Sequence, residues 1–268
     1  ISVACNTQND QQKMTATYML NEMRKNQSQL VEEVTMVSRE LMRAAVSPQE
    51  LWKEALEQAY GQYMGRDSDG AAISTYSERI AMMLKTLTDM HGSMEKEEGN
   101  EKVESPSASD AFEFSEGAGN IGSVTLRDIA FRHSYGRELA MAQDLLEQFK
   151  KTGLMATLHE LWEIYFRIIQ RTEVNISLQK KVQLHHVSRE LTSSRNLILC
   201  VPGTYAPNKE VVSIAKFVNT LDVIVSKQRP RRLAMLGSDG NTYEFLLKGK
   251  EDLRQDERVM QLFELINQ

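Results

Sequence analysis

Apolar residues recur with helical spacing through the first two thirds of the chain. From Leu30 they fall at positions 30, 34, 37, 41 and 44, which is the spacing of one helix face. Ser47, Pro48 and Glu50 then form a capping box with Pro at the first helical position, so a new helix is predicted to begin there. Its predicted apolar stripe runs from Leu51 to Tyr63. The same spacing predicts further helices, at about residues 71–94, 124–151 and 154–171.

Helices joined by short turns bury their apolar stripes most simply as an antiparallel bundle. Residues 47–172 are therefore predicted to form an all-α antiparallel four-helix bundle, preceded by further helix in residues 1–46. One connection is unusual, since residues 94–122 contain eight acidic residues against two lysines, interleaved with Ser, Gly and Ala. Such a stretch cannot bury enough surface to offset its ordering entropy, which predicts a disordered acidic insertion. A phospho-regulated segment is the alternative that its serines leave open.

After about residue 181 the period changes to short apolar and alternating runs separated by Pro, Gly and Asn, which predicts a small antiparallel sheet in residues 173–268. The predicted strands are at residues 182–184, 197–201, 211–218, 221–225, 233–236 and 243–248, with a hairpin turn at 237–240. A last helix is predicted from about Leu253, with Val259, Leu262, Phe263 and Ile266 as its buried stripe. The expected fold class is therefore α+β.

Composition narrows the function classes. With 268 residues, 41% hydrophobic and 26% charged, the chain has the profile of a folded soluble protein of one or two domains. A net charge of −5 argues against nucleic acid as the main partner, and no apolar run approaches the length of a membrane span. Cys5 and Cys200 support neither a disulfide framework nor a thiolate zinc site, so we expect a reducing compartment. His185 and His186 are predicted to point to opposite faces of a strand, and no metal site is expected. Because the chain lacks an initial Met and ends within an apolar-periodic segment, we expect a piece of a longer protein.

The most informative chemistry lies in the last hairpin and helix. Strand alternation puts Leu246 and Lys248 on one face and Phe245 on the other. Asp256 falls on the predicted apolar stripe of the helix, where an unpaired carboxylate would cost several kcal/mol. Lys248 is the expected partner, with Glu251 as a competitor. Such a pair either holds a lysine on nucleotide phosphates, as in kinase-like folds, or is a structural ion pair.

A basic turn precedes this hairpin. Residues 226–232 (SKQRPRR) contain four positive charges and no acid, and their amides, hydroxyl and cations could hold a phosphate. The sequence has neither of the glycine-rich phosphate-binding motifs. Without other support, a solvated basic loop is the alternative.

These segments resemble a known family. Residues 201–205 (VPGTY), 224–233 (IVSKQRPRRL) and 245–263 (FLLKGKEDLRQDERVMQLF) resemble the kinase N-lobe of the target of rapamycin (TOR) kinases, which are phosphatidylinositol 3-kinase-related protein kinases. Residues 36–41, 50–56, 135–139 and 161–165 resemble the end of that family's FAT helical region and its rapamycin-binding (FRB) four-helix bundle.

The resemblance implies an ATP-dependent Ser/Thr protein kinase in growth or nutrient signalling. It implies that Lys248 contacts the ATP phosphates and that Asp256, with Glu251 nearby, orients it. Ser226 would belong to a phosphate loop without glycines, while Ile224, Pro230 and Leu246 would cover the adenine. It places the catalytic residues and the Mg²⁺ ligands in a C-lobe beyond this sequence, so no catalytic or metal-binding residue is assigned here, and we expect no phosphoryl transfer from this piece alone.

The resemblance also implies a drug-binding and substrate-recruiting cleft in the bundle that gates the active site. The matching positions are Leu56, Tyr60, Tyr63, Met64, His159, Trp162, Glu163, Phe166 and Ile169. Tyr60 replaces a small Ser of the family, Met64 and Ile169 replace Phe, and His159 replaces Thr. A tyrosine there fills space that the macrolide needs, so weak or no binding of the immunophilin–rapamycin complex is expected. Trp162 is otherwise a plain core aromatic, and partial exposure would favour recruitment.

Three functional hypotheses remain at this stage. The first is a TOR-like kinase segment whose partners are protein substrates and TOR-complex subunits, in the cytoplasm or at endomembrane surfaces. The second is a non-catalytic helical scaffold or pseudokinase, which would not need the pair of Lys248 with Asp256. The third is a lipid kinase of the wider superfamily, which is disfavoured because a bundle before the lobe is a feature of the protein-kinase branch.

Overall fold

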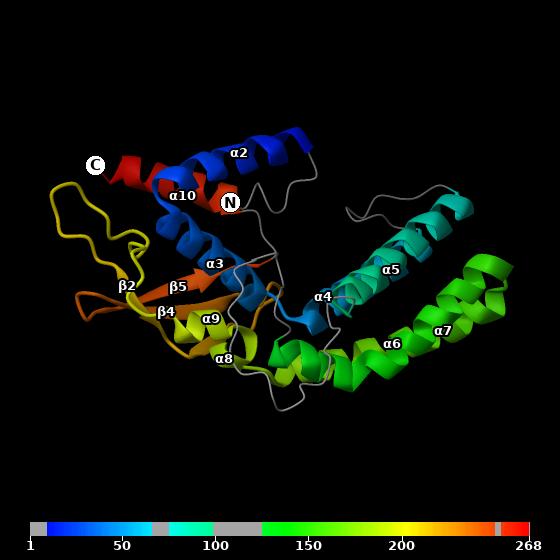
Figure 1. Ribbon diagram of the computed structural model, residues 1–268. Helices are drawn as coiled ribbons and strands as arrows, with labels where there is room; N and C mark the ends of the chain where they lie inside the picture. The colour runs from blue at the N-terminus through cyan, green and yellow to red at the C-terminus, as the bar shows by residue number, and fades with distance from the viewer. Residues whose placement is uncertain (1–9, 66–74, 99–124, 250–252, 268) are drawn as a thin grey trace, which may run out of the picture. The chain divides into compact units, whose positions relative to one another are not determined.

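The chain folds into two compact units that do not follow one another along the sequence. The computed structural model describes residues 10–65, 75–98, 125–249 and 253–267 (Figure 1). One unit, here called the helical unit, is Pro48–Ile176. The other, the sheet unit, combines Ile1–Ser47 with Ser177–Gln268. The sheet unit is therefore assembled from two stretches of chain with the helical unit inserted between them.

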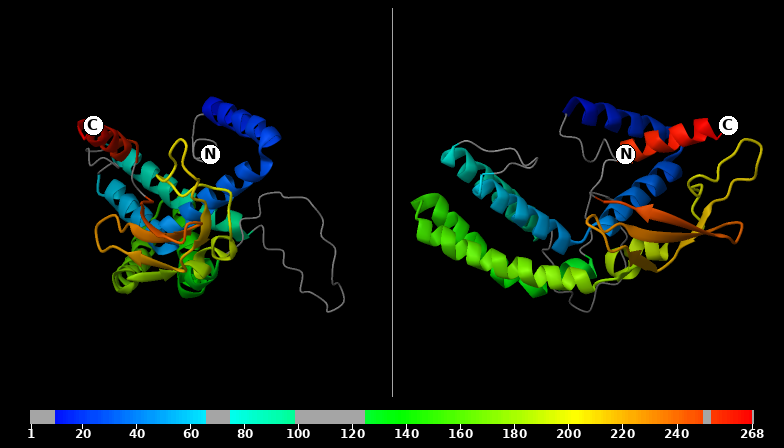
Figure 2. Two further views of the ribbon diagram at one scale, coloured as in Figure 1. Left: turned by 90° about the vertical axis from the view of Figure 1, so that its left-hand side faces the viewer. Right: turned by 180° about the vertical axis from the view of Figure 1, so that it is seen from behind.

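The helical unit contains four helices that share one hydrophobic core. They are α4 (Pro48–Tyr63), α5 (Tyr76–Glu98), α6 (Leu126–Thr152) and α7 (Met155–Leu178). Helix α6 begins at a complete capping box, in which the Thr125 hydroxyl accepts from the Asp128 N–H and the Asp128 carboxylate accepts from the Thr125 N–H. It ends at Gly153, whose positive φ of 65° is the usual helix stop. Helices α4 and α5 run side by side in both orientations of Figure 2.

The predicted stripes of the helical unit are largely confirmed. Trp52, Leu161 and Tyr165 are buried together in its core, whereas Leu51, predicted on the same stripe as Trp52, is half exposed. Burial raises the pKa of the Tyr165 phenol, whose oxygen lies 2.9 Å from Nε2 of His91. The predicted acidic insertion began too early, because α5 continues to Glu98 and the rest of that segment lies outside the described residues.

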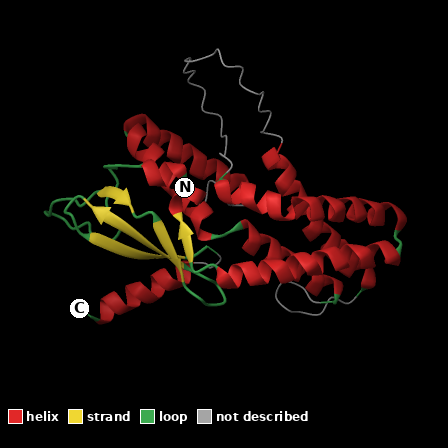
Figure 3. Cartoon of the chain, turned by 90° about the horizontal axis from the view of Figure 1, so that it is seen from below, coloured by secondary structure: helices red, strands yellow, loops and turns green. Residues whose placement is uncertain are grey.

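The sheet is antiparallel throughout, as predicted (Figure 3, yellow). Its strands are β1 (Lys181–Gln183), β2 (Ile214–Phe217), β3 (Thr220–Val223), β4 (Arg231–Gly237) and β5 (Thr242–Leu247). Strand β4 is central, since β5 pairs along its whole length while β3 pairs with its beginning and β2 with its end. The predicted hairpin turn after Gly237 is confirmed, with a positive φ of 81° at Gly240. Residues 197–201 are not a regular strand as predicted, but they lie antiparallel to the chain at β2. They share the isolated bridge between Cys200 and Ser213 and three further backbone hydrogen bonds with residues 212–214.

The first strand was predicted to continue too far along the chain, since β1 ends at Gln183. The backbone N–H groups of Leu184 and His185 donate to the carbonyl and side-chain oxygens of Asn219, which turns the chain into the short helix α8 (Leu184–Val187). The prediction that His185 and His186 point to opposite faces of a strand is therefore wrong, and their rings lie 4.1 Å apart, centroid to centroid. Helix α9 (Arg189–Ser193) follows, capped by the Ser188 hydroxyl.

One face of the sheet is covered by helices from both stretches of the sheet unit. Helix α2 (Asp10–Asn26) precedes α3 (Ser28–Ala45). Val37 and Ala44 of α3 are buried in the same core as Leu221 of β3 and Leu233 of β4. Helices α8 and α9 contribute to this core as well. Helix α3 is therefore a structural component of the sheet unit.

Helix α10 (Leu253–Ile266) begins where the sequence predicted, but its apolar stripe is exposed. Val259, Leu262, Phe263 and Ile266 were predicted to be buried, and in the described chain no other element covers them. The periodicity predicted the helix and its apolar face, but it could not show whether another part of the chain covers that face. None of the described helices is long and apolar enough to cross a bilayer.

Candidate functional site

The ion pair expected from the sequence is present in the sheet unit. Lys248 follows directly after β5, and its Nζ donates to Oδ2 of Asp256 on the first turn of α10, at 2.8 Å. A quarter of the lysine side chain and about half of the aspartate side chain are exposed (25% and 55%). The ion pair holds the amine in place, and the lysine side chain as a whole is partly exposed. Glu251, the predicted competitor, lies outside the described residues.

An apolar surface lies on the same side of the sheet as this pair. Tyr243, Phe245 and Leu247 pack toward the core, so the alternation of β5 puts Leu246 and Lys248 on the opposite face, as predicted. Leu246 is opposite Arg232 in the register, and it is 51% exposed. Exposed leucine beside an anchored amine suits a ligand with a flat apolar part and an anionic part.

The loop between β3 and β4 is held by its own hydrogen bonds. The Ile224 N–H donates to the Pro230 carbonyl at 2.9 Å, which closes the loop at its base. The Ser226 hydroxyl accepts from the Arg229 N–H at 3.1 Å, and Arg229 has a positive φ of 48°. Ile224 is exposed beside this loop. The loop therefore has a defined conformation that carries Ser226 and Ile224.

Two of the four cations predicted for this loop belong to β4. Arg231 is buried, and its guanidinium donates to the Arg229 carbonyl. Arg232 lies 2.7 Å from Asp222 and 3.7 Å from Glu244, on the exposed face of the sheet. The hydrogen bond that Arg232 donates to Asp222 holds the pKa of the Asp222 carboxyl below its usual range. The same hydrogen bond raises the pKa of the Arg232 guanidinium. The basic cluster is therefore not a single phosphate cradle, because Arg232 is already neutralised by carboxylates.

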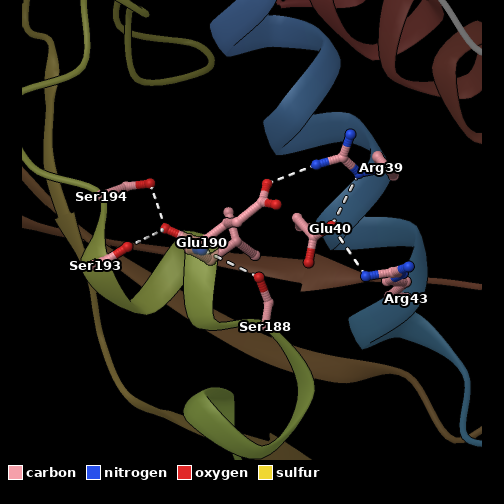
Figure 4. Close-up of polar contacts among 8 residues, drawn as sticks. Arg39, Glu40, Arg43, Ser188, Glu190, Ser193 and Ser194 are labelled. Atoms are coloured by element: carbon pink, nitrogen blue, oxygen red, sulfur yellow. Dashed lines mark hydrogen bonds and ion pairs between the residues drawn. The ribbon is translucent and has the colours of Figure 1, made fainter. Parts of the chain in front are cut away.

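A second polar network joins α3 to α9 in the sheet unit (Figure 4). The buried carboxylate of Glu40 lies 3.0 Å from Nε of Arg39 and 3.3 Å from Nη1 of Arg43. Arg39 also reaches Glu190 on α9, at 2.6 Å. The hydrogen bond that Arg39 donates to Glu40 raises the pKa of Arg39; desolvation opposes this shift, and the charge of Glu190 supports it. This network fixes the rotation of α3 against the sheet unit.

In the helical unit, the predicted cleft positions form an aromatic cluster from α4 and α7. The ring of Tyr60 meets those of Trp162 and Phe166 edge to face, with centroids 5.2 and 5.0 Å apart. Tyr63 lies 6.1 Å from Trp162. Trp162 is only 4% exposed, so its environment is that of a core aromatic and not of a recruiting groove. Tyr60 therefore occupies the space beside the tryptophan.

The other predicted cleft positions surround this cluster without joining it. Leu56 is buried, Ile169 packs on the core and Met64 is exposed. Nε2 of His159 lies 3.6 Å from Oε1 of Glu163, and both side chains are exposed. An open groove of about 420 Å³ on α7 is lined by Glu163, Phe166, Arg167 and Gln170. Among the described residues, no group of three or more His, Cys, Asp or Glu side chains could hold a metal ion.

Comparisons with known proteins show which family this chain resembles. The family model of the FKBP12-rapamycin binding domain matches residues 119–174. The chain is 37% identical over 265 residues to serine/threonine-protein kinase TOR of Oryza sativa subsp. japonica, covering 99% of this chain and 9% of the relative. It is 36% identical over 267 residues to serine/threonine-protein kinase tor1 of Schizosaccharomyces pombe, covering 100% of this chain and 10% of the relative. It is 34% identical over 268 residues to serine/threonine-protein kinase TOR2 of Saccharomyces cerevisiae, covering 100% of this chain and 9% of the relative. The chain belongs to the TOR serine/threonine-protein kinase family.

The chain spans about a tenth of the length of those relatives. The match to the FKBP12-rapamycin binding domain contains α6 and most of α7, and with them Trp162 and Phe166. Tyr60 lies on α4, before the matched residues. Among solved structures, the open conformation of CtTel1 matches at 18% identity with a TM-score of 0.25. The match covers 95% of this chain and 9% of the CtTel1 chain. That score is too low to establish a common arrangement.

Two structural features of the chain were not predicted from its sequence. The Glu40 network joins residues about 150 positions apart (Arg39 and Glu190), and no local pattern signals such a contact. Gly249, next to Lys248, packs against the end of α3. The only local signal for it is a glycine directly after a strand, which often marks a close approach of two backbones.

Proposed function

We propose that the sheet unit is the ATP-binding part of a TOR kinase N-lobe, in a protein that transfers the γ-phosphoryl group of ATP to Ser or Thr of other proteins. The observation that carries this proposal is the 2.8 Å pair of Lys248 with Asp256. A lysine held by an acid on the following helix keeps its charge in a fixed position, where it can contact phosphate oxygens. Asp256 orients the amine in this proposal, and Glu251, outside the described residues, is proposed as a second acid for the same role.

The remaining ATP contacts follow from the exposed face of the sheet. Ile224 and Leu246 are exposed apolar side chains, and with Pro230, whose carbonyl accepts from the Ile224 N–H, they form the surface proposed for adenine. Ser226 belongs to the proposed phosphate loop, where its hydroxyl already organises the backbone. The donor set therefore fits a nucleotide: one anchored cation, one hydroxyl loop and an apolar platform. Bound Mg²⁺ would neutralise charge on the phosphates, and its ligands are proposed to lie in a C-lobe outside this chain.

The helical unit is proposed to be the FRB four-helix bundle of the same kinase, which gates the active site and docks protein substrates or TOR-complex subunits. Its proposed contact surface is the exposed edge of the aromatic cluster, with Phe166 and Met64, because Trp162 itself is buried. The immunophilin–rapamycin complex is expected to bind weakly or not at all, because the Tyr60 ring fills the space beside Trp162. The proposed location is the cytoplasm, including endomembrane surfaces.

Phosphorylation of a protein substrate by the full-length kinase that contains this chain tests the proposal. Lys248→Met removes the proposed phosphate contact and is expected to lower kcat/KM by at least about a hundredfold. Lys216→Met is the matched control, since Lys216 is an exposed lysine of β2, and it should leave activity unchanged.

Two results would contradict the proposal. Equal activity of Lys248→Met and the unmodified kinase would show that the assignment of Lys248 is wrong. A folded full-length protein without activity, with or without the substitution, would support the non-catalytic scaffold instead.

A further inference from the structure

Gly249 lies against the end of α3 with no room for a side chain. A methyl group at this position would overlap Cγ2 of Val46 and lie 2.9 Å from Cβ of Ala45 and 3.0 Å from the Ala45 carbonyl oxygen. Two of these three atoms are a backbone oxygen and a Cβ, which cannot move aside as the tip of a flexible side chain does. The segment that follows β5 therefore touches α3 closely, one residue after Lys248.

The end of α3 is itself fixed. Ala44 and Ala45 are buried, and Ala44 lies in the core of the sheet unit. The helix is further held by Arg39 on Glu190 at 2.6 Å and by Glu33, whose carboxylate accepts from the Ile198 N–H at 2.8 Å. Because α3 is anchored along its length, an added atom at Gly249 must displace the β5 side of the contact.

We propose that the last turn of α3 positions Lys248, through the close contact of Ala45 and Val46 with Gly249. This inference rests on the proposed function of Lys248 as a phosphate contact. Gly249 is a positioning residue, since it acts through the neighbouring lysine and touches no ligand. A helix more than 200 positions earlier in the chain then sets where the amine stands relative to Asp256 and to the nucleotide.

The test is Gly249→Ala in the full-length kinase. The added methyl group shifts the strand end away from α3, so kcat/KM for ATP is expected to fall on the order of tenfold to a hundredfold, mainly through a higher KM. Labelling of Lys248 by a lysine-acylating ATP derivative, followed by mass spectrometry, should slow by a similar factor. Gly136→Ala is the matched control, because nothing lies within 4 Å of a methyl group at that helical position.

A compensating change separates positioning from simple loss of structure. Val46→Ala removes the atom that the new methyl group overlaps most, while the contacts with Ala45 remain, so the double variant Gly249→Ala/Val46→Ala should recover part of the lost labelling rate and of the KM. A protein that is merely partly unfolded would show a lower kcat at unchanged KM.

An unchanged KM and labelling rate in Gly249→Ala would overturn this inference alone, provided that Lys248→Met is inactive. A loss confined to kcat, without rescue by Val46→Ala, would overturn it as well. An active Lys248→Met would instead overturn the proposed function on which it rests.

Discussion

The two units of this chain reach a buried core by different routes. The helical unit is one continuous stretch whose four helices supply the whole core from their own stripes. The core of the sheet unit needs Val37 and Ala44 of α3, which are separated from the strands by the whole helical unit. Local periodicity is enough to specify the first kind of core, whereas the second depends on a distant segment.

The candidate sites differ in the same way. In the helical unit, the cleft beside Trp162 is filled by a ring of the unit itself, Tyr60. In the sheet unit, Leu246 and Ile224 are exposed, and Lys248 forms an ion pair with Asp256. The first site is closed by packing, while the second is open and organised by charge.

The largest effect is expected from breaking the dependence of the sheet on α3. Ala44→Asp places a carboxylate in the core of the sheet unit, at a cost of several kcal/mol. Met42→Asp, on the exposed side of the same helix, should change little. In hydrogen exchange, β3 and β4 should lose protection in Ala44→Asp while α6 and α7 keep theirs. Equal loss in both units would mean that the two cores do not fold separately.

Helices and strands were predicted unequally well from the sequence. The starts of α4 and α10 were predicted within a residue, because Pro at a first helical position and a change of period are local signals. The boundary between β1 and α8 was missed, since it depends on Asn219, which accepts hydrogen bonds from a segment more than thirty residues earlier. Local patterns therefore specified the elements but not the tertiary contacts that end them.

The candidate site shows the same division. Lys248 and Asp256 are eight residues apart on adjacent elements, so strand alternation and helical spacing were enough to predict their ion pair. Arg231 and Arg232 were wrongly placed in a loop, because their roles depend on neighbouring strands: Arg231 is buried, and Arg232 meets Asp222 across the sheet. The role of Gly249 was not predicted, since a glycine near a strand end is a weak signal and the contact that requires it is with the distant helix α3.

An intermediate effect is expected from opening the closed site. Tyr60→Ser removes the ring that packs on Trp162 and Phe166, and the affinity for the immunophilin–rapamycin complex should rise at least about tenfold, equivalent to about 1.4 kcal/mol. Tyr60→Phe keeps the ring and should bind as weakly as the unmodified protein. Titration of the complex, followed by calorimetry, measures both. Tight binding by the unmodified protein would show that Tyr60 does not block the cleft.

The smallest effect concerns the ion pair on the open face of the sheet. The hydrogen bond from Arg232 lowers the folded-state pKa of Asp222, so the pair stabilises the protein above the unfolded-state pKa of about 3.9 and ceases to do so as pH falls through the folded value. Arg232→Gln should therefore lower the unfolding midpoint slightly at pH 7, and the difference from the unmodified protein should vanish in acid and shrink in high salt. Arg195→Gln is the control, because Arg195 donates to the carbonyls of Thr192 and Ser194 and to no carboxylate. If the difference between Arg232→Gln and the unmodified protein persisted at low pH, its cause would be packing of the arginine stem on the sheet and not the charge of the guanidinium. The open face of the sheet would then be stabilised by packing, as the closed site beside Trp162 is.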